Sequence, residues 1–158
     1  MVLKIDGNGS RRDYSGADSV STPESIEALL EAARYDDLDD VMSLASYGVS
    51  LDSKDSEGRT ALHMASANGH SNIIDYLIRN GADVNASNLE KNTPLHWACL
   101  NGHVKVVKSL ILAGASVSAL NSHERTPIDE VVSRGKMNVL DAINEAEAQL
   151  ELTRTTVS

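Results

Sequence analysis

Phenylalanine is absent from this sequence of 158 residues, and all aromatic residues together make up only 3% of it. Any hydrophobic core must therefore consist of Leu, Ile, Val, Ala and Met side chains, which make many small contacts in place of a few large aromatic ones. Cysteine is nearly absent as well. Because Cys99 is the only one, the chain cannot form an internal disulfide, and a reducing compartment is the expected environment.

Long apolar runs are also missing. No stretch reaches the roughly 18 consecutive apolar residues that suggest a membrane-spanning helix. Residues 1–19 lack the apolar segment of a secretory signal peptide. We therefore expect the protein in the cytosol, the nucleus or both.

Basic residues are scarce relative to acidic ones. The chain has 14 Lys and Arg residues against 23 Asp and Glu residues, a net charge of −9. Such a charge repels nucleic-acid phosphates and anionic membrane surfaces and favours a protein with a basic segment as the partner. Ten acidic residues against two basic ones lie between Glu24 and Glu57. A charge run of this kind also occurs as an ordinary solvated surface. The acidic patch within this segment comprises Asp36, Asp37, Asp39 and Asp40.

The chain repeats itself with a period of 33 residues. The hexapeptide TALHMA at residues 60–65 recurs as TPLHWA at residues 93–98 and as TPIDEV at residues 126–131. The tripeptide Asn-Gly-His at residues 68–70 recurs at residues 101–103. The same register extends backward with fewer matches, so the pattern predicts four units. They span residues 22–54, 55–87, 88–120 and 121–152.

Each unit has the pattern of two short helices. In the second unit Leu62 and Ala65 lie at helical spacing, and Gly69 follows where a left-handed glycine would end the helix. A second helix carries its apolar residues within residues 73–78 and ends before Gly81. Helices this short are unstable alone, so neighbouring units must stack and bury their apolar faces together.

The two ends of the array depart from the repeat. Residues 21–24 have the Ser-x-x-Glu form of a capping box, which indicates the start of the first helix. In the last unit Glu147 replaces the glycine that ends the second helix elsewhere, so we expect this helix to continue to about Leu152. Residues 1–20 and residues 153–158 have few apolar positions and are expected to be disordered, which leaves residues 21–152 as the repeat domain.

The repeated Thr-Pro-Leu-His, the Gly-His pair and the segment Gly-Ala-Asp-Val-Asn at residues 81–85 resemble the ankyrin repeat. The resemblance covers about residues 22–150. It implies an all-α solenoid of four helix–turn–helix units, with short finger-like turns and degenerate units at both ends. It also implies a non-catalytic protein that binds another protein through its finger tips and the facing helix positions.

The resemblance therefore places partner contacts at two sets of positions in this chain. The finger tips are Ser56, Glu57, Arg59, Leu89, Glu90, Asn92, Ser122, His123 and Arg125. The helix positions are Arg34, Tyr35, Met64, Ala67, Asn68, Trp97, Leu100, Asn101, Ser133 and Arg134.

Trp97 is the most distinctive of these residues because it is the only tryptophan. Tryptophan is favoured at interface hot spots, since it buries much area for little lost conformational entropy. Met64 and Leu100 would extend it into an exposed apolar patch. The alternative is that Trp97 packs within its own stack.

The segments at residues 60–70 and 95–103 are also similar to those of a small acidic ankyrin-repeat chaperone that escorts a basic KH-domain protein of the small ribosomal subunit. This narrower resemblance implies that the carboxylate-rich first units shield a cationic ribosomal segment. The alternative is a scaffold or adaptor in signalling or transcription with no chaperone role. In either case we expect a monomer that does not bind nucleic acid or a membrane directly.

Residues with catalytic or metal-binding chemistry do not form a recognisable motif. The histidines follow the repeat spacing, which is not a metal-ligand pattern. The ankyrin resemblance implies that His63 and His96 tie neighbouring turns together by hydrogen bonds. Cys99 lies on the packing face of a helix with no base beside it. We therefore expect no catalytic residue, no cofactor and no metal ion.

Asn85 is a candidate modification site. It ends an Asp-Val-Asn sequence that resembles the ankyrin segment on which an asparaginyl hydroxylase acts. The alternative is that its amide simply satisfies backbone groups of the turn.

Overall fold

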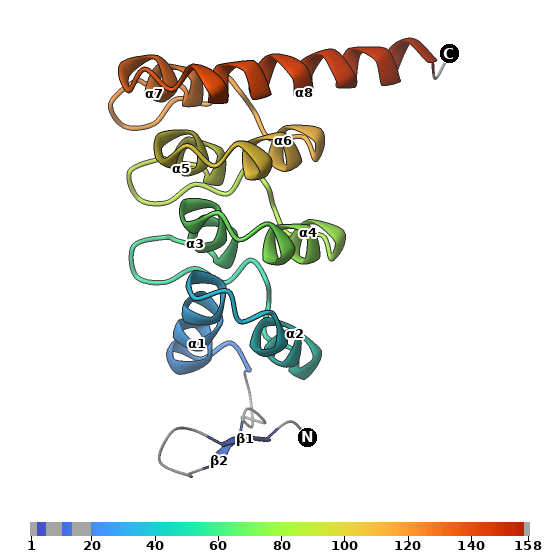
Figure 1. Cartoon of the computed structure of the whole chain (residues 1–158). Helices are drawn as coiled ribbons and strands as arrows, with labels where there is room; N and C mark the ends of the chain where they lie inside the picture. The colour runs from blue at the N-terminus through green and yellow to red at the C-terminus, as the bar shows by residue number, and fades with distance from the viewer. Residues whose placement is uncertain (1–2, 6–10, 14–19, 157–158) are drawn as a thin grey trace.

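A computed structural model of the chain describes residues 3–5, 11–13 and 20–156. Eight helices within the last of these ranges form four stacked pairs (Figure 1). The first helices of the units are α1 (Pro23–Arg34), α3 (Ala61–Asn68), α5 (Pro94–Asn101) and α7 (Pro127–Ser133). The second helices are α2 (Leu38–Tyr47), α4 (Ser71–Arg79), α6 (Val104–Leu112) and α8 (Met137–Thr156).

The helices form two rows that run along the stack. In one row α1, α3, α5 and α7 each pack on the next, and in the other α2, α4, α6 and α8 do the same. The turns that connect the units project beside the first row (Figure 1). This arrangement confirms the predicted all-α solenoid. Within the described ranges, no helix combines the length and the apolar character needed to cross a bilayer.

A threonine starts the first helix in each of the last three units. The hydroxyl groups of Thr60, Thr93 and Thr126 accept a hydrogen bond from the backbone of the third helical residue, whose side chain accepts one from the threonine N–H. This reciprocal pair satisfies two of the amides that a helix N-terminus leaves unpaired. In the fourth unit Asp129 replaces the usual histidine as acceptor, and its Oδ2 lies 2.8 Å from the Thr126 nitrogen.

Glycine ends the first helix of the second unit for two reasons. Gly69 has a φ of 74°, in the left-handed region that side chains disfavour. A Cβ atom added at this position would also lie only 2.6 Å from Nδ1 of His103 in the next unit. The predicted helix end is thus correct, and a close contact between units reinforces it.

Aliphatic side chains from both rows fill the core between units. The side chains that are almost completely buried include Leu29, Leu44, Leu62, Ile73, Ile74, Leu77, Leu95, Leu110, Ile111 and Ile143. Each such side chain contributes about 1.5–3 kcal/mol relative to an exposed one. Since α3 and α5 have only 8 residues each, their stability comes from this burial against neighbouring units, as the sequence predicts.

Two buried histidines connect α3 and α5 to the finger turn that follows each helix. His63 Nδ1 accepts a hydrogen bond from the Thr60 N–H at 3.1 Å, so Nε2 carries the proton and donates to the Asn92 carbonyl at 2.8 Å. His96 donates in the same way to the Arg125 carbonyl at 2.9 Å. The structural role that the resemblance implies for these histidines agrees with this geometry.

Two further histidines reach back to the preceding unit. His70 Nε2 lies 2.7 Å from the Arg34 carbonyl, and His103 Nε2 lies 2.9 Å from the Ala67 carbonyl. Both carbonyls belong to the last turn of a helix, where they lack an intrahelical partner. The four histidines therefore join successive units through backbone carbonyls.

The ends of the chain differ from the predictions. The last helix continues past Leu152 to Thr156, so most of the segment expected to be a disordered tail is helical. No helix-stopping glycine or proline occurs there, and an acidic and a basic residue, Glu151 and Arg154, form an ion pair at 3.7 Å on this turn. Residues 157–158 lie outside the described residues.

The N-terminal segment also differs where it is described. Residues 1–20 are expected to be disordered, but β1 (Leu3–Ile5) and β2 (Arg11–Asp13) form an antiparallel pair. Alternation of apolar and polar residues in the first strand fits this pairing. The capping box expected at residues 21–24 is not formed, because Thr22 is the N-cap and accepts from the Ser25 N–H at 3.2 Å, while the Ser25 hydroxyl donates to the carbonyls of Val20 and Thr22. Residues 1–2, 6–10 and 14–19 lie outside the described residues.

The buried histidines make stability depend on pH. Burial lowers the pKa of His63 from 6.5 to about 4, because burial disfavours the charged imidazolium. The unfolded chain therefore takes up a proton below pH 6.5 that the folded chain excludes until about pH 4. We expect the free energy of unfolding to fall across this window as the pH is lowered, by about 1.4 kcal/mol per pH unit for each such proton. Urea denaturation at several pH values measures this free energy of unfolding.

Two variants separate the contribution of His63 from that of other groups. His63→Ala should lower the free energy of unfolding at neutral pH by about 2–4 kcal/mol and flatten its pH dependence. His123→Ala, on an exposed finger tip, is the control and should change it by less than about 0.5 kcal/mol. An unaltered pH dependence in the His63 variant would show that this histidine does not cause it.

Candidate functional site

Side-chain acceptors at the start of each of the last three units hold the finger turns in shape. Oδ1 of Asp55 accepts hydrogen bonds from the N–H groups of Glu57 and Arg59, both at 2.9 Å. Asn88 and Asn121 occupy the same repeat position and bind the backbone of their own turns in the same way. The finger tips are therefore ordered by local hydrogen bonds.

Neighbouring finger tips are also bonded to each other. The Leu89 N–H donates to the Glu57 carbonyl at 3.0 Å, and the Ser122 N–H donates to the Glu90 carbonyl at 2.8 Å. The three tips form a continuous strip along one side of the stack (Figure 1). A partner that contacts this strip meets a surface that is largely preformed.

The structure exposes most of the residues predicted to contact a partner. The exposed ones are Tyr35, Ser56, Glu57, Asn68, Leu89, Glu90, Asn101, Ser122, His123, Arg125, Ser133 and Arg134. The half-buried ones are Arg34, Arg59, Ala67, Asn92, Trp97 and Leu100. They come from the finger turns and from the first row of helices, so the two sets lie on adjoining parts of the molecule.

Met64 is the exception, and its prediction as a contact residue is wrong. It is only 3% exposed, because α1 and α5 pack on both sides of its helix. Its sulfur also accepts a hydrogen bond from Nη2 of Arg34 at 3.4 Å. The expected apolar patch of Met64, Trp97 and Leu100 is therefore reduced to the two half-buried side chains of α5.

Two other predicted contact residues have structural roles. Arg59 binds Asp55 through Nε at 2.8 Å and Glu57 through Nη2 at 3.1 Å, so its guanidinium is engaged within its own finger. Asn92 accepts from His63 through its carbonyl and from the Asn121 amide through Oδ1 at 3.0 Å. The side-chain atoms of both residues are partly used inside the stack.

Trp97 lies at the base of a small hollow between fingers. Its ring packs edge-on against His63 of the preceding unit, with centroids 5.2 Å apart and planes at 69°. The hollow has a volume of about 260 Å³ and is also lined by Leu89, which is 74% exposed at the finger tip. Trp97 thus combines packing within the stack with a surface that remains open.

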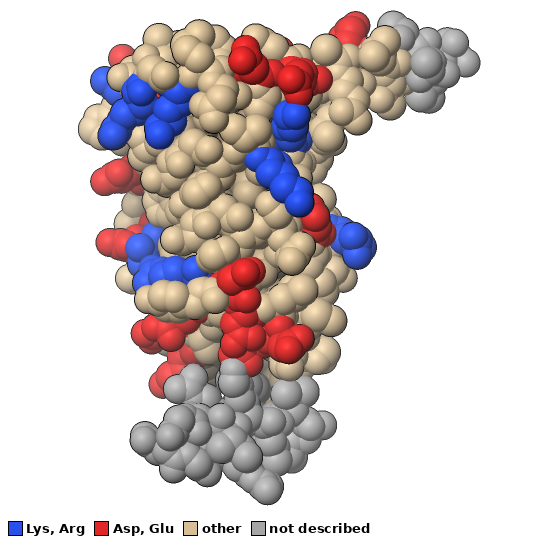
Figure 2. All heavy atoms as spheres, viewed as in Figure 1, with Lys and Arg blue, Asp and Glu red and all other residues tan. Residues whose placement is uncertain are grey.

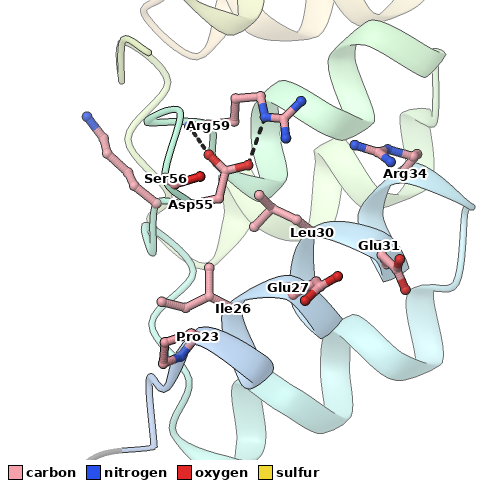
Figure 3. A pocket seen from close by; sticks show the side chains of 10 residues that line it. Pro23, Ile26, Glu27, Leu30, Glu31, Arg34, Asp55, Ser56 and Arg59 are labelled. Atoms are coloured by element: carbon pink, nitrogen blue, oxygen red, sulfur yellow. Dashed lines mark hydrogen bonds and ion pairs between the residues drawn. The ribbon is translucent and has the colours of Figure 1, made fainter. Parts of the chain in front are cut away.

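A second hollow, of about 590 Å³, lies between α1 and the first finger turn, residues 55–59 (Figure 3). We call it the α1 groove. Sequence reasoning missed it, although two signals were present. Leu30 stands where the repeat has His63, and Pro23 allows α1 to begin about one turn earlier than the repeat register predicts. Its lining residues are Pro23, Ile26, Glu27, Leu30, Glu31, Arg34, Lys54, Asp55, Ser56 and Arg59.

The acidic patch follows α1 along the chain, with Asp36 and Asp37 in the turn before α2 and Asp39 and Asp40 in its first turn. Asp36, Asp37 and Asp39 are exposed, and Asp40 is half-buried. Asp37 also caps α2 by accepting from the Asp40 N–H at 3.1 Å, and Oδ1 of Asp36 lies 3.9 Å from Nδ1 of His70. Figure 2 shows acidic side chains gathered at the α1–α2 end of the stack and basic ones at the α7 end.

The described residues offer little chemistry for catalysis or metal binding. They contain no group of three or more His, Cys, Asp or Glu side chains arranged to hold a metal ion. The Cys99 thiol is fully buried, and burial together with the nearby charge of Glu130 raises its pKa to about 12. A thiol with such a pKa supplies almost no nucleophilic thiolate at neutral pH.

Asn85 uses both ends of its amide to hold the next turn. Nδ2 donates to the Gly114 carbonyl at 3.1 Å, and Oδ1 accepts from the Ser116 N–H at 2.8 Å. The side chain is nevertheless exposed. The amide of Asn85 therefore has the structural role of binding backbone groups of the next turn. Hydroxylation of Asn85 stays a prediction.

Comparison with known proteins agrees with this architecture. Residues 29–121 match a family model described as ankyrin repeats, three copies. The human protein phosphatase 1 regulatory subunit 27 is 39% identical over 61 residues, which cover 39% of this chain and 40% of that protein.

Two further relatives are longer proteins, and the matching segment covers only a small part of each. The Caenorhabditis elegans ankyrin repeat and KH domain-containing protein mask-1 is 40% identical over 70 residues, or 44% of this chain and 3% of that protein. The yeast palmitoyltransferase AKR1 is 43% identical over 61 residues, which cover 39% of this chain and 8% of that protein. The chain thus matches less than half the length of each of these three relatives.

The burial of Cys99 leads to a direct test of the packing between units. In the native protein at pH 8 we expect the thiol to react with an aromatic disulfide reagent at least about a hundredfold more slowly than in denaturant, because the thiolate forms only when the stack opens. The absorbance of the released thiolate follows the reaction. A native rate equal to the denatured rate would contradict the buried position.

Proposed function

The chain belongs to the ankyrin-repeat family, and we propose that it is a non-catalytic escort that binds and shields a cationic segment of a basic protein. Family membership itself makes it a protein–protein interaction module. The escort role is a more specific proposal than protein binding, and it rests mainly on one observation. Exposed carboxylates of the first unit that form no ion pair among the described residues lie on α1 and at the start of α2, beside a preformed groove; they are Glu24, Glu27, Glu31, Asp37 and Asp39.

The charge distribution supports a basic partner. The acidic side chains on α1 and on the turn before α2 are close together, so their fields add over this end of the molecule (Figure 2). A cationic segment would be attracted from a distance, and acidic competitors would be repelled. The net charge of −9 acts in the same direction over the whole chain.

The similarity to a small acidic ankyrin chaperone suggests a class of client. A basic KH-domain protein of the small ribosomal subunit carries cationic segments that bind RNA after assembly and need cover before it. A cytosolic or nuclear location and a monomeric state are parts of this proposal. The shielding requires one escort for each client.

A second candidate function is that of an adaptor with no chaperone role. The hollow formed by Trp97 and Leu89 favours it, since an exposed aliphatic side chain beside a tryptophan is typical of apolar docking sites. A relative named as a regulatory subunit of a phosphatase is consistent with such a role. Salt dependence distinguishes the two candidates, because apolar contacts are not screened.

The escort role predicts that partner capture depends on the acidic patch. We expect a basic protein to be recovered near one-to-one from lysate at about 0.15 M salt and to be lost at several times that ionic strength. The triple variant Asp36→Asn, Asp37→Asn, Asp39→Asn should reduce the affinity about tenfold or more at the lower salt concentration. Asparagine retains the ability to cap α2, so the fold is preserved.

A matched control removes the same charge elsewhere. Asp75→Asn, Asp141→Asn and Glu147→Gln neutralise exposed carboxylates of the second row of helices, which form no ion pair among the described residues. This variant should bind the basic partner about as tightly as the parent. Equal losses in both triple variants would indicate a dependence on net charge alone, and no loss in either would refute the escort role.

The adaptor role predicts a different sensitivity. Leu89→Ser should reduce the affinity for a salt-resistant partner about tenfold without affecting stability, since the side chain is 74% exposed. Trp97→Ala should weaken the same partner further but also loosen the contact with His63. Isothermal titration calorimetry with the purified partner, together with urea denaturation of both variants, separates these effects. A Leu89 variant with unchanged affinity would exclude the finger hollow from the interface.

A further inference from the structure

The α1 groove lies where the first unit differs from the repeat pattern in two ways. In the second and third units a finger turn precedes the first helix, whereas in the first unit the chain is already helical at Pro23. As a result α1 has 12 residues, while α3 and α5 have 8 each. Its additional turn lies beside the finger turn of residues 55–59 (Figure 3).

The second difference is the missing histidine. In the following units a buried imidazole crosses from the helix to the next finger and donates to the carbonyl of Asn92 or Arg125. Leu30 occupies the equivalent position in α1 and cannot make this hydrogen bond. The space between helix and finger is therefore open and is lined by the aliphatic side chains of Ile26 and Leu30 (Figure 3).

Two carboxylates stand on the helix side of this groove. Glu27 and Glu31 lie four residues apart, so they occupy the same face of α1 and repel each other. Both side chains are exposed, and neither carboxylate forms a hydrogen bond or an ion pair within the described residues. A like-charge pair of this kind lowers the stability of the isolated helix, and a cation placed between the two would reverse the effect.

The basic residues around the groove are engaged elsewhere. Arg59 binds the carboxylates of its own finger, Asp55 and Glu57. The Lys54 ammonium donates to the Ser87 carbonyl at 2.9 Å, and the Arg34 guanidinium donates to the Met64 sulfur. The charge of Glu27 and Glu31 therefore has no partner among these groups.

We infer that the α1 groove is the subsite that receives the cationic segment, and that it takes an aliphatic side chain directly beside a Lys or Arg. The aliphatic side chain packs on Ile26 and Leu30, while the basic one pairs with Glu27 and Glu31. This inference rests on the proposed escort function and adds its sequence preference. A purely basic segment lacks the apolar contact, and an acidic amphipathic segment is repelled by the two carboxylates.

Three synthetic peptides of equal length test this preference on the full chain. One alternates Leu with Lys, the second alternates Leu with Glu, and the third alternates Ser with Lys. In amide NMR titrations we expect the Leu–Lys peptide to shift the resonances of Ile26, Leu30 and Arg59. The Leu–Glu peptide should not shift them, and the Ser–Lys peptide should bind about tenfold more weakly.

Two double variants with the same change in net charge complete the test. Glu27→Gln with Glu31→Gln should weaken the Leu–Lys peptide about tenfold at low salt. Asp141→Asn with Glu147→Gln, on α8, should leave its dissociation constant within about twofold. All four residues are exposed, so the spectra of both variants should show the native fold.

Shifts confined to other regions, or equal binding of the Leu–Lys peptide by both double variants, would overturn the assignment of the groove. Different results would refute the proposed function itself. These are that no salt-sensitive basic partner is captured, or that the triple variant of the acidic patch binds this partner as tightly as the parent. A natural basic partner that binds the Glu27 and Glu31 variant as tightly as the parent would leave the escort role intact and refute the groove as its subsite.

Discussion

The contact between neighbouring units is the interaction on which the rest of this structure depends. All of the helices except α8 have 7 to 12 residues. This is at or below the length at which an isolated helix is stable in water. Their apolar stripes are covered only when the units stack. Histidines add a directional component, because each one hydrogen-bonds to a backbone carbonyl of an adjacent unit. The low pKa of His63 follows from the same burial that stabilises the stack.

This constraint divides the residues between scaffold and surface. Positions that contact a neighbouring unit serve the fold, and Met64 and Asn92 are among them, while Arg59 is engaged within its own finger. Positions that point away from the stack, such as Leu89 and the exposed tip residues, are not needed for contacts between units. An interaction surface can therefore change without loss of the fold.

The first unit shows how a departure from the repeat can create a site. Its first helix lacks the histidine with which α3 and α5 bind the finger turn of the following unit. Leu30 and the additional turn of α1 leave an open groove there, and the unpaired Glu27 and Glu31 give it a negative charge. The terminal unit thus combines the role of a cap with an open, negatively charged groove, which our proposal assigns to a basic, partly apolar segment.

The sequence by itself determined the period of 33 residues, the four units, the helix pairs and the ends set by Gly69 and the capping threonines. These features are local or strictly periodic, so they can be predicted from spacing and backbone preference alone. It also located the acidic patch, since charge is read directly from composition.

Tertiary structure decided the rest. Met64 looks like a surface residue by its position in the repeat, but helices on both sides cover it. The extension of α8 to Thr156 and the pairing of the two N-terminal strands depend on weak local preferences that composition does not resolve. The α1 groove depends on the distance between a helix and a turn about 30 residues apart in sequence, and no local pattern encodes that distance. The physical reason is the same in each case, because burial and open space are properties of the packed chain and arise only when the units meet.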